Sequence, residues 1–295
     1  MSPVTAEETG AGGPLRLGLI GRGITLSRTP RMHEAEAAAQ GLACRYDLLD
    51  MDAGVEGSLS EIVDRAEAEG YAGLNVTFPY KQEIIPLLDG LSDAARRVEA
   101  VNTVVFHEGR RSGHNTDFWG FSENLRRNLP DADIGTVLLI GAGGAGGAVG
   151  HALADLGAGR ILIFDRRDGA AEALAQAVNA AAGRPVAGAA EALPAAAAEA
   201  RGIVNATPVG MAKMPGTPID TALLTPDQWV ADIVYFPLET EFLCKAKAVG
   251  CRTLSGEGMA IFQAVRAFEL FTGIRPAAER MRQAFHAQAP DEGAA

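Results

Sequence analysis

Short aliphatic runs alternate along the chain with longer segments in which apolar residues recur at helical spacing. Runs of this kind are typical of strands buried on both faces of a sheet. They predict strands at Leu15–Ile20, Arg45–Leu49, Gly73–Val76, Asn102–Phe106, Thr136–Ile140, Arg160–Phe164, Gly202–Asn205, Trp229–Ile233 and Cys251–Thr253. Helices are predicted between them, at His33–Gln40, Ser60–Glu69, Phe118–Arg127, Gly143–Leu156 and Ala170–Ala182. Strands that alternate with helices indicate an α/β fold with mostly parallel sheets covered on both faces.

The polar segment Asn128–Ile134 (NLPDADI) reads as a linker, because it contains a proline and precedes a new strand. We therefore predict a tail over residues 1–14, one α/β domain over residues 15–128 and a second over residues 129–258. The Ala-rich segment Gly188–Ala200 is predicted to be a solvent-facing helix. The amphipathic segment Met259–Phe271 follows the last strand, and the pattern alone leaves open whether it packs back on the first domain.

The composition narrows the classes of function. The 295 residues carry 26 Lys and Arg against 37 Asp and Glu, a formal net charge of −11 without a basic block. Nucleic acids and anionic membranes need clustered Lys and Arg, so we expect neither as a partner. No apolar run reaches the roughly 18–20 residues that span a bilayer, and the N-terminus lacks the features of a secretory signal. With three cysteines and no disulfide framework, we expect a cytoplasmic protein.

A glycine-rich turn opens the second domain. The strand Thr136–Ile140 leads into Gly141-Ala-Gly143-Gly-Ala-Gly146, and a helix follows directly. Gly141 permits the tight turn, Gly143 lets the backbone approach a pyrophosphate, and Gly146 lets helix and strand pack closely. A glycine turn packed only for steric reasons is the alternative. The strand and helix around the motif favour a Rossmann-type dinucleotide site.

Asp165 bears on the choice of cofactor. It ends the next strand, 19 residues after Gly146, where a carboxylate accepts hydrogen bonds from an adenosine ribose and repels a 2′-phosphate. Arg166 and Arg167 follow at once and would suit a 2′-phosphate instead. Because Asp165 occupies the position that faces the ribose, we expect NAD rather than NADP.

Polar side chains follow several predicted strands of the first domain, at strand ends where α/β domains place ligands. They offer hydroxyls (Ser27, Thr29, Thr77), amides (Asn75, Asn102, Asn115), an amine (Lys81) and a carboxylate (Asp117). This set suits a small polyhydroxylated acid, and Lys81 with Asp117 would form a proton-transfer pair. Helix capping is the alternative role for Ser27, Thr29 and Asp117, and a helix-start position the alternative for Lys81. No spacing of His, Cys and Asp supports a metal site.

The chain resembles the shikimate/quinate dehydrogenase family from Leu15 to Gly273. The resemblance rests on ordered motifs, namely LSRTPRMHEAE, GLNVTFPYK, EAVNTV, GHNTDFWGF, GAGGAGGA, NATPVGM, ADIVYFPLETEFL and GEGMAIFQAVRAFELFTG. It implies an N-terminal substrate-binding α/β domain, a Rossmann-type cofactor domain and a cleft between them. It also implies that helices over about residues 259–287 complete the first domain.

The resemblance further implies reversible oxidation of one ring hydroxyl of shikimate or quinate by a nicotinamide cofactor. Carried over position by position, it makes Lys81 and Asp117 the catalytic pair. The implied substrate-binding residues are Ser27, Thr29, Thr77, Lys81, Asn102, Asp117, Tyr235 and Gln263. The implied cofactor-binding residues are Gly141, Ala142, Gly143, Gly144, Ala145, Asp165, Arg166, Thr207, Ile233, Gly256 and Met259. Family members occur as monomers and dimers, so a homodimer stays open.

Two departures from the biosynthetic pattern affect the choice of reaction. The first loop reads Leu26-Ser-Arg-Thr-Pro30 where that pattern has His-Ser-x-Ser-Pro, and Asp165-Arg-Arg replaces an Asn-Arg-Thr-like stretch that takes NADP. Both departures resemble NAD-dependent quinate/shikimate dehydrogenases of quinate catabolism, which is the function we expect. The alternatives are an NADP-dependent biosynthetic shikimate dehydrogenase, a catalytically silent metabolite sensor, and a folate-linked methylene dehydrogenase. Intact Lys81 and Asp117 argue against the sensor, and the first-domain motifs argue against the folate-linked enzyme.

Overall fold

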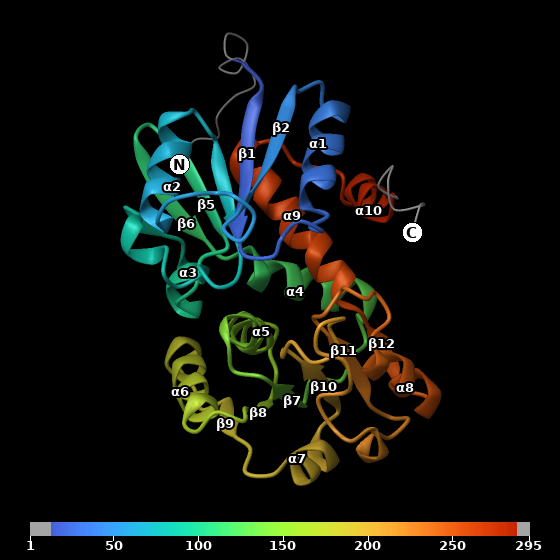
Figure 1. Cartoon of the computed structure of the whole chain (residues 1–295). Helices are drawn as coiled ribbons and strands as arrows, with labels where there is room; N and C mark the ends of the chain where they lie inside the picture. The colour runs from blue at the N-terminus through green and yellow to red at the C-terminus, as the bar shows by residue number, and fades with distance from the viewer. Residues whose placement is uncertain (1–12, 288–295) are drawn as a thin grey trace. The chain divides into compact units, whose positions relative to one another are not determined.

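The computed structural model describes residues 13–287 and divides into two compact units (Figure 1). The first unit contains the chain up to Arg96, Ala100–Thr116 and the chain from Gln263 onward. The second contains Arg97–Glu99 and Asp117–Phe262. The predicted tail lies outside the described residues except for residues 13 and 14. Within the described part of the chain, no helix is both long and apolar enough to cross a membrane.

The first unit is built on a mixed sheet. Its strands, in spatial order, are β2 (Cys44–Asp50), β1 (Leu15–Gly21), β3 (Gly73–Val76), β5 (Thr103–His107), β6 (Arg110–His114) and β4 (Gly90–Leu91). β2, β1 and β3 pair in parallel, but β5 runs antiparallel to β3 and to β6. β4 pairs with β6 in parallel, so the expectation of mostly parallel pairing is met with β5 as the antiparallel exception, because β5 and β6 are joined by the tight turn that antiparallel neighbours permit.

Helices cover both faces of this first sheet. They are α1 (Thr29–Ala39), α2 (Leu59–Ala68), the last part of α9 (Gly256–Thr272) and α10 (Ala278–His286); α3 (Asp93–Val98) and the short 3₁₀ helix η1 (Ile85–Leu87) connect strands. Side chains alternate along β1: Ile20 packs in one cluster with α2, whereas Leu17 and Leu19 pack in another with Phe271 of α9. A Cβ on Gly73 would lie 2.4 Å from the Phe271 ring. From Gln263 on, the C-terminal amphipathic segment thus packs on the first unit.

The second unit contains a fully parallel sheet. Its strands are β9 (Ala187–Ala189), β8 (Arg160–Phe164), β7 (Thr136–Ile140), β10 (Gly202–Asn205), β11 (Trp229–Asp232) and β12 (Arg252–Leu254), adjacent in that order. Its helices are α4 (Thr116–Asn128), α5 (Gly144–Asp155), α6 (Ala170–Ala182), α7 (Leu193–Glu199) and α8 (Glu241–Val249), with the 3₁₀ helix η2 (Thr221–Leu223). Counted from β7, the strand order is 3-2-1-4-5-6, the order of a dinucleotide-binding sheet. The predicted Rossmann-type architecture is confirmed.

The division by contacts differs from the predicted domain bounds at α4. Phe121 and Leu125 of this helix, with Leu129 after it, are buried in one cluster with Val137 and Trp229 of the second sheet. The predicted linker at Asn128–Ile134 therefore lies inside the second unit, and the chain passes between the units after Thr116. The predicted boundary at residue 258 moves as well, because Met259 packs in the same cluster.

The Ala-rich segment also differs from its prediction as a solvent-facing helix. It begins in strand β9 and continues into the short helix α7, with Ala196, Ala197 and Ala200 buried in the second unit's other core cluster. Alanine suits both a solvent-facing helix and a closely packed one, so composition alone did not separate the two.

Candidate functional site

The polar residues predicted in the first unit meet at one edge of its sheet. β1 and β3 are parallel neighbours, so the segments that follow Gly21 and Val76 leave from the same edge. β5 is antiparallel to β3, which brings the residue before its first position, Asn102, to this edge too. Backbone hydrogen bonds join the segments: Thr77 N–H donates to the Ile20 carbonyl (2.9 Å), and Val76 N–H to the Asn102 carbonyl (2.8 Å).

The loop after β1 presents two hydroxyl groups side by side. Ser27 Oγ donates to Thr29 Oγ1 at 3.1 Å, and Thr29 N–H donates to Ser27 Oγ at 3.3 Å. The buried carboxylate of Asp50 accepts from the N–H groups of Gly23 and Ile24 and so fixes the start of the loop. The N-cap residue of α1, Arg28, makes no side-chain capping bond, but Ser27 Oγ accepts from Thr29 N–H at the start of the helix. A capping role therefore stays an alternative for Ser27.

Asn102 is the centre of a buried polar network in the first unit. Its Nδ2 donates to Thr116 Oγ1 (3.0 Å) and to Gln263 Oε1 (3.3 Å), and its Oδ1 accepts from Thr116 N–H (2.7 Å). Two of the predicted substrate-binding residues, Asn102 and Gln263, are thus brought into contact. The other amides of the sequence inventory support the fold: Asn75 Oδ1 accepts from Tyr46, and Asn115 Nδ2 donates to the Ala100 carbonyl.

Lys81 lies in the segment after β3. Its carbonyl accepts from Val101 N–H at 2.7 Å, which ties this segment to the chain before β5. Turns and then η1 follow β3 here, so the α-helix expected after this strand is absent from this described segment. Asp117 is buried in the first turn of α4 and belongs to the second unit, as does Tyr235. The pairing of Lys81 with Asp117 stays a prediction.

The glycine turn of the second unit has the shape that a phosphate cradle needs. Gly141 has φ of +106°, and a Cβ on Gly146 would lie 2.0 Å from the Gly141 carbonyl oxygen. A Cβ on Gly143 or Gly144 would meet no atom within 4 Å, so the approach to these residues is open. Gly143 begins α5 without a side-chain cap, which leaves the first N–H groups of the helix for an anion.

Thr207 and Asp165 lie against this turn. β10 is the neighbour of β7, and a Cβ on Gly141 would lie 2.9 Å from Thr207 Cγ2. Asp165 Oδ2 accepts from Ala142 N–H at 2.7 Å, and Asp165 Oδ1 accepts from Arg167 N–H (2.9 Å) and Nε (3.0 Å). The hydrogen bond from the Arg167 side chain lowers the pKa of Asp165 to about 2. The carboxylate is therefore ionised at neutral pH, and Arg166 is exposed.

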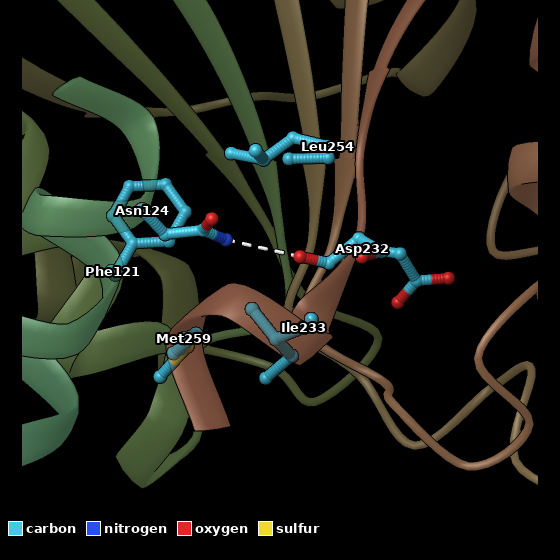
Figure 2. Close-up of a pocket in the computed structure, with 9 residues that line it drawn as sticks. Phe121, Asn124, Asp232, Ile233, Leu254 and Met259 are labelled. Atoms are coloured by element: carbon cyan, nitrogen blue, oxygen red, sulfur yellow. Dashed lines mark hydrogen bonds between the residues drawn. The ribbon is translucent and has the colours of Figure 1, made fainter. Parts of the chain in front are cut away.

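Three predicted cofactor-binding residues line one hollow, at the carboxyl ends of β11 and β12. Figure 2 shows Ile233 and Met259 with Phe121, Asn124 and Leu254 around it, and Gly256 completes this wall. Glycine is required here, because a Cβ on Gly256 would lie 2.3 Å from the Ile233 carbonyl oxygen. Asn124 Nδ2 donates to the Ser255 carbonyl at 3.0 Å and holds the turn in place.

A buried network that sequence reasoning did not single out supports this hollow. Asp232 Oδ1 accepts from Asn205 Nδ2 (2.9 Å) and Val234 N–H (3.0 Å), and Oδ2 accepts from Thr240 Oγ1 (2.7 Å). Asn205 Oδ1 in turn accepts from Thr207 Oγ1 at 2.7 Å, so the network joins two loops of predicted cofactor residues. Burial raises the pKa of Asp232 to about 6. The feature of the sequence that could have revealed this network is Asp232, the polar last residue of the otherwise apolar strand β11.

Metal ligands do not cluster in the described residues: between residues 13 and 287, no three His, Cys, Asp or Glu side chains are grouped so that they could hold an ion. The donors at both strand edges are hydroxyls, amides and backbone N–H groups, which suit an organic ligand and a nucleotide.

A sheet of order 3-2-1-4-5-6 with an anion cradle and a carboxylate after its second strand defines a dinucleotide-dependent dehydrogenase. The family models that match are the shikimate dehydrogenase substrate binding domain, over residues 19–104, and the shikimate 5′-dehydrogenase C-terminal domain, over residues 256–284. The chain belongs to the shikimate/quinate dehydrogenase family.

Similar proteins differ in cofactor. A quinate/shikimate dehydrogenase (NAD⁺) of Corynebacterium efficiens is 52% identical over 91% of this chain and 96% of its own. A shikimate dehydrogenase (NADP⁺) of Streptomyces avermitilis is 50% identical over 90% of this chain and 92% of its own. Among solved structures, quinate dehydrogenase from Corynebacterium glutamicum in complex with NAD matches with a TM-score of 0.89 and 46% identity, over 92% of this chain and 98% of that one. Overall identity therefore does not select the cofactor.

Proposed function

We propose that this protein catalyses the reversible, NAD-dependent oxidation of a ring hydroxyl of quinate, shikimate or both to the 3-dehydro acid. The observation that carries the choice of cofactor is Asp165, whose ionised carboxylate lies against the glycine turn. The substrate class is supported by family membership and by the similarity to enzymes named quinate/shikimate dehydrogenase (NAD⁺). The Asp165 carboxylate attracts ribose hydroxyls and repels a 2′-phosphate.

The geometry of the second unit supports the proposed cofactor residues. The N–H groups that open α5 hold the pyrophosphate, Asp165 binds the adenosine ribose, and Ile233, Gly256 and Met259 contact the nicotinamide end. When bound, NAD supplies the acceptor for the hydride of the substrate. Gly141–Ala145, Arg166 and Thr207 complete the proposed cofactor residues.

The proposed substrate-binding residues are hydrogen-bonding groups. The adjacent hydroxyls of Ser27 and Thr29 bind the substrate carboxylate, and Thr77, Asn102 and Gln263 bind ring hydroxyls; Tyr235 and Asp117 are proposed as further substrate-binding residues. In each case the group is a hydrogen-bond donor or acceptor matched to an oxygen of the substrate. A substrate without a carboxylate would leave the hydroxyls of Ser27 and Thr29 with no anion to bind.

The chemistry assigned to Lys81 is proton transfer. Oxidation of the substrate carbon requires that its hydroxyl proton leave, so a base must lie within hydrogen-bond reach of that oxygen. The neutral Lys81 amine accepts this proton in the forward direction and returns it in reverse. Asp117 orients the amine, and it accepts a hydrogen bond from a substrate hydroxyl.

Initial rates test the proposal. We expect NADH formation near pH 9 with both quinate and shikimate, and much slower NADPH formation. Lys81→Ala should lower kcat by about 10²–10⁴-fold, the usual contribution of a general base, and leave the Kd of NAD unchanged. Lys245→Ala, which removes an exposed lysine paired with Glu241 on α8, is the matched control and should retain full activity.

The same measurements decide between the alternatives. Activity confined to NADP and shikimate would establish the biosynthetic enzyme, with Arg166 and Arg167 as the residues that bind the 2′-phosphate. No oxidation under any pairing, with thermal stabilisation by shikimate, would establish a metabolite sensor. Near-normal turnover of Lys81→Ala would remove Lys81 from the mechanism.

Assembly and location are predictions from the sequence and the family. We propose a cytoplasmic enzyme on the grounds of its acidic composition and its three unpaired thiols, Cys44, Cys244 and Cys251. The homodimer found among family members is checked by light scattering during size-exclusion chromatography.

A further inference from the structure

Arg28 lies between the two hydroxyl residues Ser27 and Thr29, and its side chain contacts the C-terminal helix α10. Its guanidinium carbon lies 5.0 Å from the centroid of the Phe285 ring. Its Nη1 donates to the Phe285 carbonyl oxygen at 3.2 Å. The residue that joins the hydroxyl pair is thus attached to a helix more than two hundred residues away in sequence.

The start of α1 lacks the usual side-chain cap at its N-cap position. Arg28 occupies that position, with φ of −86° and ψ of −3°, and its side chain caps none of the first N–H groups; Ser27 Oγ accepts from Thr29 N–H at 3.3 Å. Pro30 in the first turn fixes one φ angle but donates no hydrogen bond. Two side chains fix this end of α1 from outside, those of Arg28 and Arg31, which donate to the carbonyls of Phe285 and Ala287.

The end of α10 is well suited to receive an arginine. The last carbonyls of a helix lack backbone partners and carry the negative end of the helix dipole, so cations are stabilising there. Arg28 donates to the carbonyl of Phe285, and Arg31 donates to that of Ala287. The Phe285 side chain is fully buried, which fixes the ring over which Arg28 lies.

The opposite end of α10 is fixed to α1 as well. Glu36 is fully buried, and its carboxylate accepts from Ala277 N–H (3.0 Å) and from Arg280 Nε (2.6 Å). α10 is therefore held to α1 at both of its ends, and Figure 1 shows the two helices next to each other. A helix held in this way is a rigid support for the loop that Arg28 anchors.

We propose that Arg28 is a positioning residue for the substrate-carboxylate site, and that it acts by capping the C-terminus of α10. This inference rests on the proposed function, in which Ser27 and Thr29 bind the carboxylate. Two hydroxyls bind the two oxygens of one carboxylate well only if their separation and direction are set beforehand. The Arg28 backbone joins Ser27 to Thr29, so anchoring Arg28 sets the separation and direction of their two hydroxyls. The Arg28 side chain itself points to α10 and not to the substrate.

The test compares Arg28→Ala with a matched control, Arg31→Ala. We expect Arg28→Ala to raise KM for quinate and shikimate about ten-fold, with kcat within about two-fold and the Kd of NAD unchanged, because pre-organisation of the bound groups is lost. Arg31→Ala removes the neighbouring cap of the same helix but lies beyond the hydroxyl pair, so its KM values should match wild type. Arg28→Lys retains a cation that can reach the carbonyl and should recover most of the affinity.

Several results would overturn the proposal. They are an unchanged KM in Arg28→Ala, an equal rise in Arg31→Ala, or a rise that accompanies a matching fall in kcat and in thermal stability. The wild type is measured first, so its failure to oxidise either acid contradicts the proposed function alone. In that case calorimetric titration with shikimate tests Arg28 directly, with the same ten-fold loss of affinity expected.

Discussion

At the scale of single residues, Asp165 is the proposed binding residue for the adenosine ribose of the cofactor. Its carboxylate accepts from Ala142 N–H and from Arg167, and the bond from Arg167 lowers its pKa to about 2. The Asp165 carboxylate is therefore ionised at neutral and alkaline pH. Both arginines that follow are exposed, but Arg167 is occupied by this ion pair.

Asp165→Ala should weaken the discrimination against NADP. We expect the ratio of kcat/KM for NADP to that for NAD to rise about 10- to 100-fold, because the repulsion of the 2′-phosphate is removed and Arg167 is released to bind it. Asp168→Ala, three residues on and exposed, is the matched control and should leave the ratio unchanged. An unchanged ratio in Asp165→Ala would mean that the ribose is recognised elsewhere.

At the scale of elements, the approach of α5 to β7 depends on a single glycine. A Cβ on Gly146 would lie 2.0 Å from the Gly141 carbonyl oxygen, and backbone cannot yield as a flexible side chain does. Gly144, on the first turn of the same helix, has open space where its Cβ would be. The two positions therefore separate the steric role of a glycine from its role in leaving room for a ligand.

Gly146→Ala should lower the free energy of unfolding by about 3 kcal/mol, the upper range for overpacking, because helix and turn must move apart. Gly144→Ala should leave that free energy unchanged or raise it by up to about 1 kcal/mol, since alanine favours the helix. Urea denaturation of the two variants measures both. A Gly146→Ala variant as stable as wild type would show that the turn relaxes at little cost.

At the scale of the whole molecule, two buried titratable groups, one in each unit, respond to pH in opposite directions. His33 in the first unit is fully buried among the rings of Tyr46, Phe268 and Phe271, and within the described residues neither ring nitrogen has a hydrogen-bond partner. Burial lowers the pKa of His33 to about 3. Burial raises the pKa of Asp232 in the second unit to about 6.

The signs follow from the pKa values. Below its ordinary pKa of 6.5, His33 takes up a proton in the unfolded chain but not in the folded one, so stability is lost as the pH falls. Asp232 takes up a proton in the folded state first, below about pH 6, and so contributes stability as the pH falls towards its ordinary 3.8. A fall in pH therefore lowers the stability of the first unit through His33. In the second unit it raises stability through Asp232, because the buried carboxylate is neutralised.

Replacing the imidazole removes its share of this pH dependence. Between pH 7 and pH 5 the His33 imidazole should account for a loss of about 2 kcal/mol in the free energy of unfolding. His33→Leu should therefore gain about that much relative to wild type over the same interval, as measured by chemical denaturation at both pH values. Asp232→Asn, which removes the opposite dependence, is the matched comparison. Parallel profiles for wild type and His33→Leu would show that His33 keeps its ordinary pKa.

The sequence by itself determined the features whose signals are local. The continuous aliphatic runs gave the bounds of β3, β7, β8 and β10 to the residue, because strands buried on both faces are apolar throughout. The glycine turn with Asp165 after the second strand indicated the nucleotide site, since its parts lie within one βαβ unit. Strand β6 (RRSGH) was missed, because its polar pattern becomes a strand only through pairing with β5.

Only the tertiary structure decided which distant residues meet. The passage between units after Thr116 follows from the burial of Phe121 and Leu125 beside the second sheet, and helical periodicity does not reveal which core a helix joins. The bond from Asn124 to Ser255 and the contact of Arg28 with Phe285 also join segments far apart in the chain. The local sequence pattern sets the conformation of a segment. Contacts such as those of Asn124 and Arg28 depend instead on how two whole elements pack, so only the tertiary structure fixes the residues that hold the site in place.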